Sequence, residues 1–152
     1  MPSTARRFAL ACTFTSVLLG SCSEFTSPSR DLEIARQRWA SNGAASYDFT
    51  VYLSCFCTPD AGRPVVVVVA NGVVQSRKFV GTGAAVTPPF SPAYSTIEGL
   101  FDIVADARAR NAARLDAAYD PERGYPTRIG IDYIANAVDD EINYTGLDFH
   151  VR

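Results

Sequence analysis

Residues 65–80 of the chain read VVVVVANGVVQSRKFV. The unbroken run of β-branched side chains from Val65 to Val69 favours a strand, and Asn71-Gly72 is the dipeptide typical of a tight turn between antiparallel strands. The segment from Val73 to Val80 then returns beside the first run. This stretch predicts a β-hairpin, and an antiparallel sheet is therefore the expected basis of the fold.

The sequence before the hairpin changes from a helical period to a strand period. Ser29 is a candidate cap for a helix from about Asp31 to Ser41, and Asn42-Gly43 is a typical stop signal. From Tyr47 the period is two, so alternate residues share one face of a strand. The expected inward face consists of Tyr47, Phe49, Val51, Leu53, Cys55 and Cys57.

The second half repeats this plan. Ser95 and Glu98 have capping-box spacing and predict the start of a second helix. Its expected buried stripe is Ile97, Leu100, Phe101, Val104 and Ala105. Three more strands are expected over 113–119, 127–134 and 141–149, with a bulge at Gly146. The predicted fold class is α+β, an antiparallel sheet with two helices packed on it.

The two halves also resemble each other in sequence. A shift of 62 positions aligns Pro59 with Pro121, Gly62 with Gly124, and Pro64 with Pro126. This alignment suggests two tandem αβββ units. The alternative is that turns containing proline and glycine resemble each other through composition alone.

Composition limits the function classes. The chain has 152 residues, 47% of them hydrophobic, and a formal net charge of −2. This length predicts one domain, over residues 31–152, and the near-neutral charge argues against nucleic-acid binding. His150 is the single histidine, which leaves little material for histidine catalysis or a histidine-rich metal site. No cofactor is expected, because no glycine-rich loop has the spacing that cradles a phosphate.

The N-terminus has the features of an export signal. Arg6 and Arg7 precede an apolar run from Phe8 to Leu19, which is shorter than the roughly 20 residues that span a bilayer. Leu19-Gly20-Ser21-Cys22 resembles the bacterial lipobox, so we expect residues 1–21 to be a signal peptide and Cys22 to carry lipid. Residues 22–30 form a polar tether. The expected location is the cell envelope, anchored by lipid to the inner or outer membrane.

Several motifs together resemble one family, and they extend over about residues 31–149. They are Trp39, Tyr47-x-Phe49, Cys55-x-Cys57, a valine-rich strand with Asn71-Gly72, Thr96-Ile97-Glu98-x-Leu100-Phe101, Tyr119-Asp120-Pro121-x-x-Gly124-Tyr125-Pro126, Ile131-Asp132 and Asp139-Asp140-Glu141. In this order and spacing they resemble the bacterial secreted lipoproteins of domain-of-unknown-function family 6174. The resemblance implies a small exported domain and no known activity.

Cys55 and Cys57 are the first candidates for chemistry. If Cys22 is lipidated, they form the only remaining cysteine pair, and an oxidising compartment favours a bond between them. In a regular strand their Cα atoms would be near the upper limit for a disulfide, so a bond needs a local bend. Three interpretations stay open: a structural disulfide, two buried thiols, and a redox-active or Cu(I)-binding pair.

Other residues carry weaker signals. Asp120 and Asp132 are an imaginable acid–base pair, but Asp120-Pro121 is ordinary turn chemistry, and Asp139-Asp140-Glu141 lacks the pattern of a calcium loop. The long loop over 81–94 is rich in proline and glycine, and two interpretations of it stay open. Either Val86, Phe90 and Tyr94 form an apolar contact patch on it, or the loop is a passive connector.

These observations predict a non-enzymatic protein that binds a protein or envelope component through its sheet or this loop. The alternative is an envelope thiol-redox or copper-handling protein that uses Cys55 and Cys57.

Overall fold

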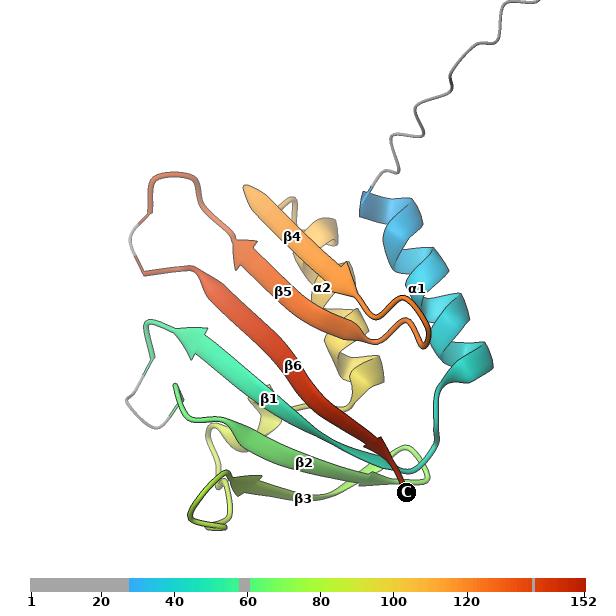
Figure 1. The fold of residues 1–152 in the computed structure, drawn as a ribbon. Coiled ribbons are helices and arrows are strands. Elements are labelled where there is room, and N and C mark those ends of the chain that lie inside the picture. The colour runs from blue at the N-terminus through green and yellow to red at the C-terminus, as the bar shows by residue number, and fades with distance from the viewer. Residues whose placement is uncertain (1–27, 58–60, 138) are drawn as a thin grey trace, which may run out of the picture.

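A computed structural model describes residues 28–57, 61–137 and 139–152 of the chain (Figure 1). The predicted signal peptide, Cys22 and most of the predicted tether lie outside the described residues. No helix among the described residues is long and apolar enough to cross a membrane.

The described elements follow the predicted order, with one short 3-10 helix added (Figure 1). The helices are α1 (Pro28–Asn42), η1 (Ser91–Ala93) and α2 (Ile97–Ala109). The strands are β1 (Tyr47–Cys55), β2 (Val65–Ala70), β3 (Val73–Phe79), β4 (Arg114–Tyr119), β5 (Pro126–Asp132) and β6 (Ile142–Val151). The α+β class is confirmed.

Helix α1 begins three residues before the predicted start. Pro28 occupies its first turn, where a missing backbone N–H removes no helical hydrogen bond. Residues 28–30 are therefore helical, and the predicted tether over 22–30 was too long at its C-terminal end. At the other end Gly43 closes the helix as expected, with its N–H donating to the carbonyl of Trp39.

The strands form one antiparallel sheet in the order β3-β2-β1-β6-β5-β4. The predicted hairpin is present as β2 and β3, with Val67 opposite Arg77. The first and last strands of the chain, β1 and β6, lie together at the centre, with Val51 opposite Gly146. The sheet is twisted, so that its edge strands β3 and β4 run in clearly different directions (Figure 1).

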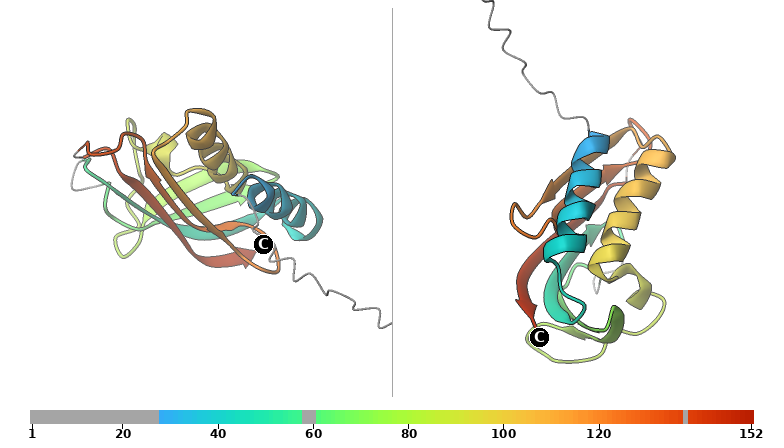
Figure 2. Two further views of the ribbon diagram at one scale, coloured as in Figure 1. Left: turned by 90° about the horizontal axis from the view of Figure 1, so that it is seen from above. Right: turned by 90° about the vertical axis from the view of Figure 1, so that its right-hand side faces the viewer.

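Both helices cover the same face of the sheet (Figure 2). Alternate residues of β1 and β2 point into the space between the layers, and the core there is almost free of solvent. Its least exposed large side chains include Tyr47, Phe49, Val51, Val67, Tyr94, Ile97, Leu100 and Ile129. At one end, Trp39 of α1 meets the rings of Tyr47 and Phe149 edge-on, which fixes α1 on the central strands.

The order αβββαβββ is confirmed, but the halves are not superimposable copies. Read across the sheet in one direction, the strands run third, second, first in both halves, and because every pair is antiparallel, β1 and β4 point in opposite directions. To align β4 with β1 and keep the helices on the same face, the second half must be turned by half a turn about the normal to the sheet (Figure 2). This rotation reverses the left-to-right order of its three strands, which then no longer matches the order in the first half. The interpretation as a superimposable duplication is therefore wrong.

Two local predictions are displaced. The bulge in β6 lies at Asp148, whose φ is 50°, and not at Gly146, which pairs with Val51. The cap of α2 is Thr96, whose side-chain oxygen accepts a hydrogen bond from the Gly99 N–H at 3.1 Å. Glu98 is left for other partners, and the predicted Ser95–Glu98 capping box is not formed.

Candidate functional site

The face of the sheet turned away from the helices is open, and we call it the outer face. In β1 the residues that alternate with the buried ones, such as Tyr52 and Ser54, belong to it. The pairing registers extend the face across all six strands. It consists of Asp48, Thr50, Tyr52, Ser54, Val66, Val68, Ser76, Lys78, Arg114, Asp116, Ala118, Arg128, Gly130, Asp132, Asn143 and Thr145.

One end of the outer face is mainly apolar. Thr50, Pro64, Val66 and Val80 line a hollow of about 490 Å³ over β1 and β2. Val80 is 47% exposed, and Tyr52 farther along β1 is 40% exposed. Aliphatic and aromatic side chains at this exposure offer contact area to a partner rather than to the core.

Charged groups border this apolar end. Asp48 accepts a hydrogen bond of 2.6 Å from Nε of Arg152, and Nδ1 of His150 lies 3.5 Å from its other oxygen. Asp148, at the bulge of β6, also lines the hollow. The single histidine of the chain therefore lies in a surface cluster with Asp48 and Arg152.

The other end of the outer face is strongly polar. Arg114, Asp116, Arg128, Asp132 and Glu141 line a hollow of about 210 Å³ over β4, β5 and β6. Arg114 pairs with Asp116 at 2.6 Å, whereas Arg128 has no hydrogen-bond or ion-pair partner within the described residues. The arginine side chains can donate hydrogen bonds to a bound molecule, and the neighbouring carboxylates can accept them.

Sequence reasoning did not select these arginines. Their only signal is the alternation in β4 and β5, which places Arg114, Asp116 and Arg128 on the polar side of weakly patterned strands. These side chains lie close together because β4, β5 and β6 are adjacent in the sheet. The order of strands in a sheet cannot be predicted from a local sequence pattern.

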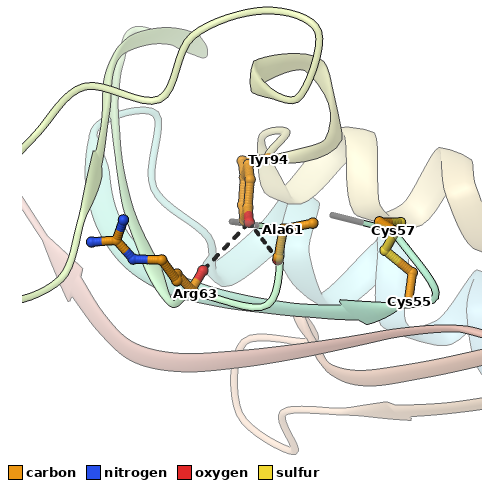
Figure 3. The surroundings of a disulfide bond; sticks show 5 residues. All are labelled: Cys55, Cys57, Ala61, Arg63 and Tyr94. Carbon is orange, nitrogen blue, oxygen red and sulfur yellow. Dashed lines mark hydrogen bonds between the residues drawn. A yellow bond between two sulfur atoms is a disulfide. The ribbon is translucent and has the colours of Figure 1, made fainter. Parts of the chain in front are cut away.

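Cys55 and Cys57 form a disulfide at the end of β1 (Figure 3). Cys55 is the last residue of the strand, opposite Ile142 of β6, and the chain bends directly after it. The bend brings the two Cα atoms to 5.2 Å, within disulfide range, as the sequence analysis required. Cys55 is half-buried and Cys57 is exposed. The interpretation as two buried free thiols is wrong.

Tyr94 anchors the chain next to the disulfide. Its hydroxyl donates to the carbonyl oxygen of Ala61 at 2.9 Å and approaches that of Arg63 at 3.4 Å (Figure 3). Burial raises the pKa of this hydroxyl, and the Arg63 charge partly opposes the rise. The guanidinium of Arg63 extends away from the sulfur atoms and lies 4.1 Å from the centre of the Phe79 ring.

The predicted contact patch on the loop over 81–94 is not formed. Val86 is 9% exposed, Tyr94 is fully buried, and Phe90 is half-buried. The loop folds back along β3, where the Val86 N–H donates to the Arg77 carbonyl and the Arg77 side chain donates to the Tyr94 carbonyl. Val86 and Tyr94 therefore complete the core and do not present an apolar surface.

Asp120 and Asp132 accept hydrogen bonds from backbone N–H groups in the turns that follow them. Asp120 accepts from the N–H groups of Glu122 and Arg123, and Asp132 accepts from that of Ile134. Asp120 follows β4, whereas Asp132 ends β5 opposite Arg114, so the two lie at opposite ends of the hairpin. They do not form an acid–base pair.

The described residues also do not bring a set of metal ligands together. Asp140 accepts a hydrogen bond of 2.7 Å from the Ile134 N–H and thereby braces its own loop. Among the described residues, no three side chains of histidine, cysteine, aspartate or glutamate are grouped so as to hold a metal ion. A Cu(I) ion at Cys55 and Cys57 would require the disulfide to be reduced first.

Comparison with known proteins gives one match. No curated protein and no solved structure matches the chain. The profile of a family of unknown function, DUF6174, matches residues 31–151, which extend from the first turns of α1 to the end of β6. The chain therefore belongs to the family of unknown function DUF6174.

Proposed function

We propose that this protein is a non-enzymatic, lipid-anchored binding module of the cell envelope, and that its outer face binds a protein or another envelope component. The observation that carries the proposal is the open face itself. Two helices cover one side of the six-stranded sheet, and they leave the other side uncovered (Figure 2). The burial pattern and the pairing registers place side chains of all six strands on that side.

The chemistry of the outer face supports binding. Tyrosine and arginine are enriched in interfaces, because each combines a large contact area with hydrogen-bonding groups. Here the exposed Tyr52 lies on β1, and Arg114 and Arg128 lie toward the opposite edge. A partner would find an apolar region and a charged region on one continuous surface.

The expected lipid on Cys22 supports the envelope address. Each buried methylene of a lipid chain contributes about 0.8 kcal/mol to membrane binding, so several chains anchor a protein stably. The domain then needs no membrane-binding surface of its own, and the outer face is left for a partner.

Site-specific photo-crosslinking in the native cells tests the proposal. A benzophenone amino acid is introduced at Tyr52 or at Arg128 on the outer face, and at Gln37 or Asp102 on the helix layer as exposed controls. We expect one discrete adduct from the outer-face positions and none from the helices. Its sensitivity to proteases distinguishes a protein partner from another envelope component.

Two results would overturn the proposal. One is the absence of an adduct at both outer-face positions in cells that contain the protein at its natural level. The other is equal crosslinking from the helix layer, which indicates random encounter. Arg128→Glu, which reverses one charge on the polar hollow, is expected to reduce the Tyr52 adduct at least fivefold without changing the unfolding temperature by more than a degree or two.

A further inference from the structure

We infer that the Cys55–Cys57 disulfide is a reversible two-electron redox site that oxidises a dithiol, with the sulfur of Cys57 as the atom attacked. This redox activity is additional to the proposed binding, and the non-enzymatic role proposed above refers to the outer face alone. The inference rests on the exposure of the pair, on the scaffold around it and on the size of the ring that it closes.

The pair is accessible and asymmetric. Cys57 is exposed, Cys55 is half-buried at the end of β1, and the ring of Phe56 between them is 78% exposed. An attacking thiolate must approach along the axis of the sulfur–sulfur bond, from the side of the sulfur that it joins. Cys57 is the more exposed residue of the pair, whereas Cys55 packs against the hydrophobic core, so the sulfur of Cys57 is the one that we infer to be attacked.

The fold on both sides of the bond is held by other interactions. Cys55 is fixed by the pairing of β1 with β6, where it lies opposite Ile142. Beyond the turn, the hydroxyl of the fully buried Tyr94 holds the Ala61 carbonyl at 2.9 Å (Figure 3). Opening the bond therefore releases the sulfur of Cys57 and leaves the strands in place, so the pair can close again.

The fold also gives the bond little protection against reduction. A disulfide stabilises a protein mainly by restricting the unfolded chain, and the restriction grows with the number of residues enclosed. Here the ring contains only Cys55, Phe56 and Cys57. Exposed disulfides of this kind are the labile and catalytic ones, in contrast to the buried disulfides that resist reduction.

The reaction is a thiol–disulfide exchange in two steps. A thiolate of the donor dithiol attacks the Cys57 sulfur and forms a mixed disulfide, and Cys55 leaves as a thiolate and takes up a proton. The second donor thiolate then attacks the donor sulfur of the mixed disulfide, and Cys57 leaves as a thiolate that is protonated in turn. The donor is oxidised to a disulfide, and the protein gains two electrons and two protons.

Native reduction of the full chain in detergent tests the inference. Dithiothreitol supplies a small dithiol and reduced thioredoxin supplies a protein dithiol, and iodoacetamide labelling is mapped by peptide mass. We expect both cysteines to be labelled within minutes while the fluorescence of Trp39 keeps its native spectrum. Oxidised glutathione is expected to restore the bond. Faster reduction by one donor identifies whether the dithiol is small or carried by a protein.

A trapping experiment identifies the attacked sulfur. A thioredoxin variant that keeps only its attacking cysteine stops the reaction at the mixed disulfide. We expect the adduct on Cys57 to exceed that on Cys55 at least tenfold, and Cys55→Ser/Cys57→Ser to give no adduct. Labelling that requires denaturant, loss of the native Trp39 spectrum on reduction, or an adduct mainly on Cys55 would overturn the inference.

Discussion

The indole N–H of Trp39 donates a hydrogen bond of 2.7 Å to Oε1 of Glu98 and thereby joins α1 to α2. The other carboxylate oxygen accepts from the Tyr47 hydroxyl at 3.3 Å, and that hydroxyl accepts from the Ile97 N–H at 2.9 Å. Burial raises the pKa of Tyr47, and the Glu98 charge adds to the rise, so the hydroxyl stays protonated and remains a donor. One carboxylate thus connects both helices to the central strand.

Removing this carboxylate should destabilise the domain. Glu98→Ala leaves the N–H of the buried Trp39 and the hydroxyl of the buried Tyr47 without their acceptor, and hydrogen bonds to charged groups contribute about 1.5–3 kcal/mol. The free energy of unfolding, measured by urea denaturation, is expected to fall by about 2 kcal/mol. Asp102→Ala, which breaks only the exposed pair with Arg36, should cost less than about 1 kcal/mol. Equal losses would contradict this role of Glu98.

Gly124 should be the least replaceable glycine. It lies between β4 and β5 with φ at 85°, and a Cβ there would collide with the carbonyl oxygen of Ala35 in α1. Gly124→Ala must therefore separate the hairpin from the helix, and we expect a loss of about 3 kcal/mol or more, read from the urea midpoint. The matched control is Gly72→Ala, with φ at 75° and open space around it, which should cost only about 1–2 kcal/mol.

Local patterns in the sequence were sufficient for most of the elements. The stripe of α2 is an example, since four of its five predicted residues are buried, and only Ala105 is half-buried where Ala107 is buried instead. The hairpin around Asn71-Gly72 is another, because both residues adopt the positive φ that this turn requires. In each case the signal and the structure that it specifies lie within a few residues of each other.

Apart from the displaced start of α1 and the displaced bulge in β6, the errors have a different cause, because they depend on contacts between distant segments. Glu98 has the spacing for a cap but binds Trp39, which is 59 residues away in sequence. Val86 and Tyr94 belong to a segment with the composition of a surface loop, but hydrogen bonds to Arg77 hold that segment against β3, and both side chains are buried in the core. The outer face likewise exists only because β1 pairs with β6. Such pairings follow from the packing of the whole chain.

Tyr119 should make stability fall at high pH. Burial and the Asp31 charge raise its pKa to about 12, against about 10 in an unfolded chain. Between pH 10 and pH 12 the unfolded chain releases this proton while the folded chain keeps it, so unfolding becomes more favourable as pH rises. Tyr119→Phe is expected to make the decline in the urea midpoint above pH 10 shallower, and an unchanged slope would contradict the assignment.

The same substitution, Tyr119→Phe, should not destabilise the protein at neutral pH. The Tyr119 hydroxyl is buried and has no hydrogen-bond partner within the described residues, whereas its ring stacks on Phe101. Phenylalanine keeps the stacking and removes the unsatisfied group, so stability at pH 7 should be unchanged or higher. A loss above about 1 kcal/mol would indicate a hydrogen bond to a residue outside the described part of the chain.

The disulfide should contribute little to stability despite its position at the end of a central strand. For a ring of three residues the loop-closure model gives about 1.6 kcal/mol, compared with 2–4 kcal/mol for typical disulfides. Cys55→Ser/Cys57→Ser is expected to lower the unfolding temperature by about 5 °C, measured by circular dichroism, and to keep the native spectrum. A double variant that does not fold would mean that β1 depends on the disulfide. The surrounding strands would then not stay in place on reduction, and the inference of a reversible redox site would lose that support.

The lipid anchor makes a prediction about location. If Cys22 carries lipid, the wild-type protein should sediment with membranes and dissolve only in detergent, because two or more acyl chains anchor a protein stably in a bilayer. Cys22→Ser should accumulate in soluble or uncleaved form and lose incorporation of labelled palmitate, while the folded domain keeps its unfolding temperature. Cys12→Ser, at the other cysteine of the N-terminal segment, serves as the control and should behave as wild type. Membrane sedimentation of Cys22→Ser after the leader has been removed would show that another part of the protein contacts the bilayer, and the exposed Tyr52 and Val80 of the outer face would be the first residues to test.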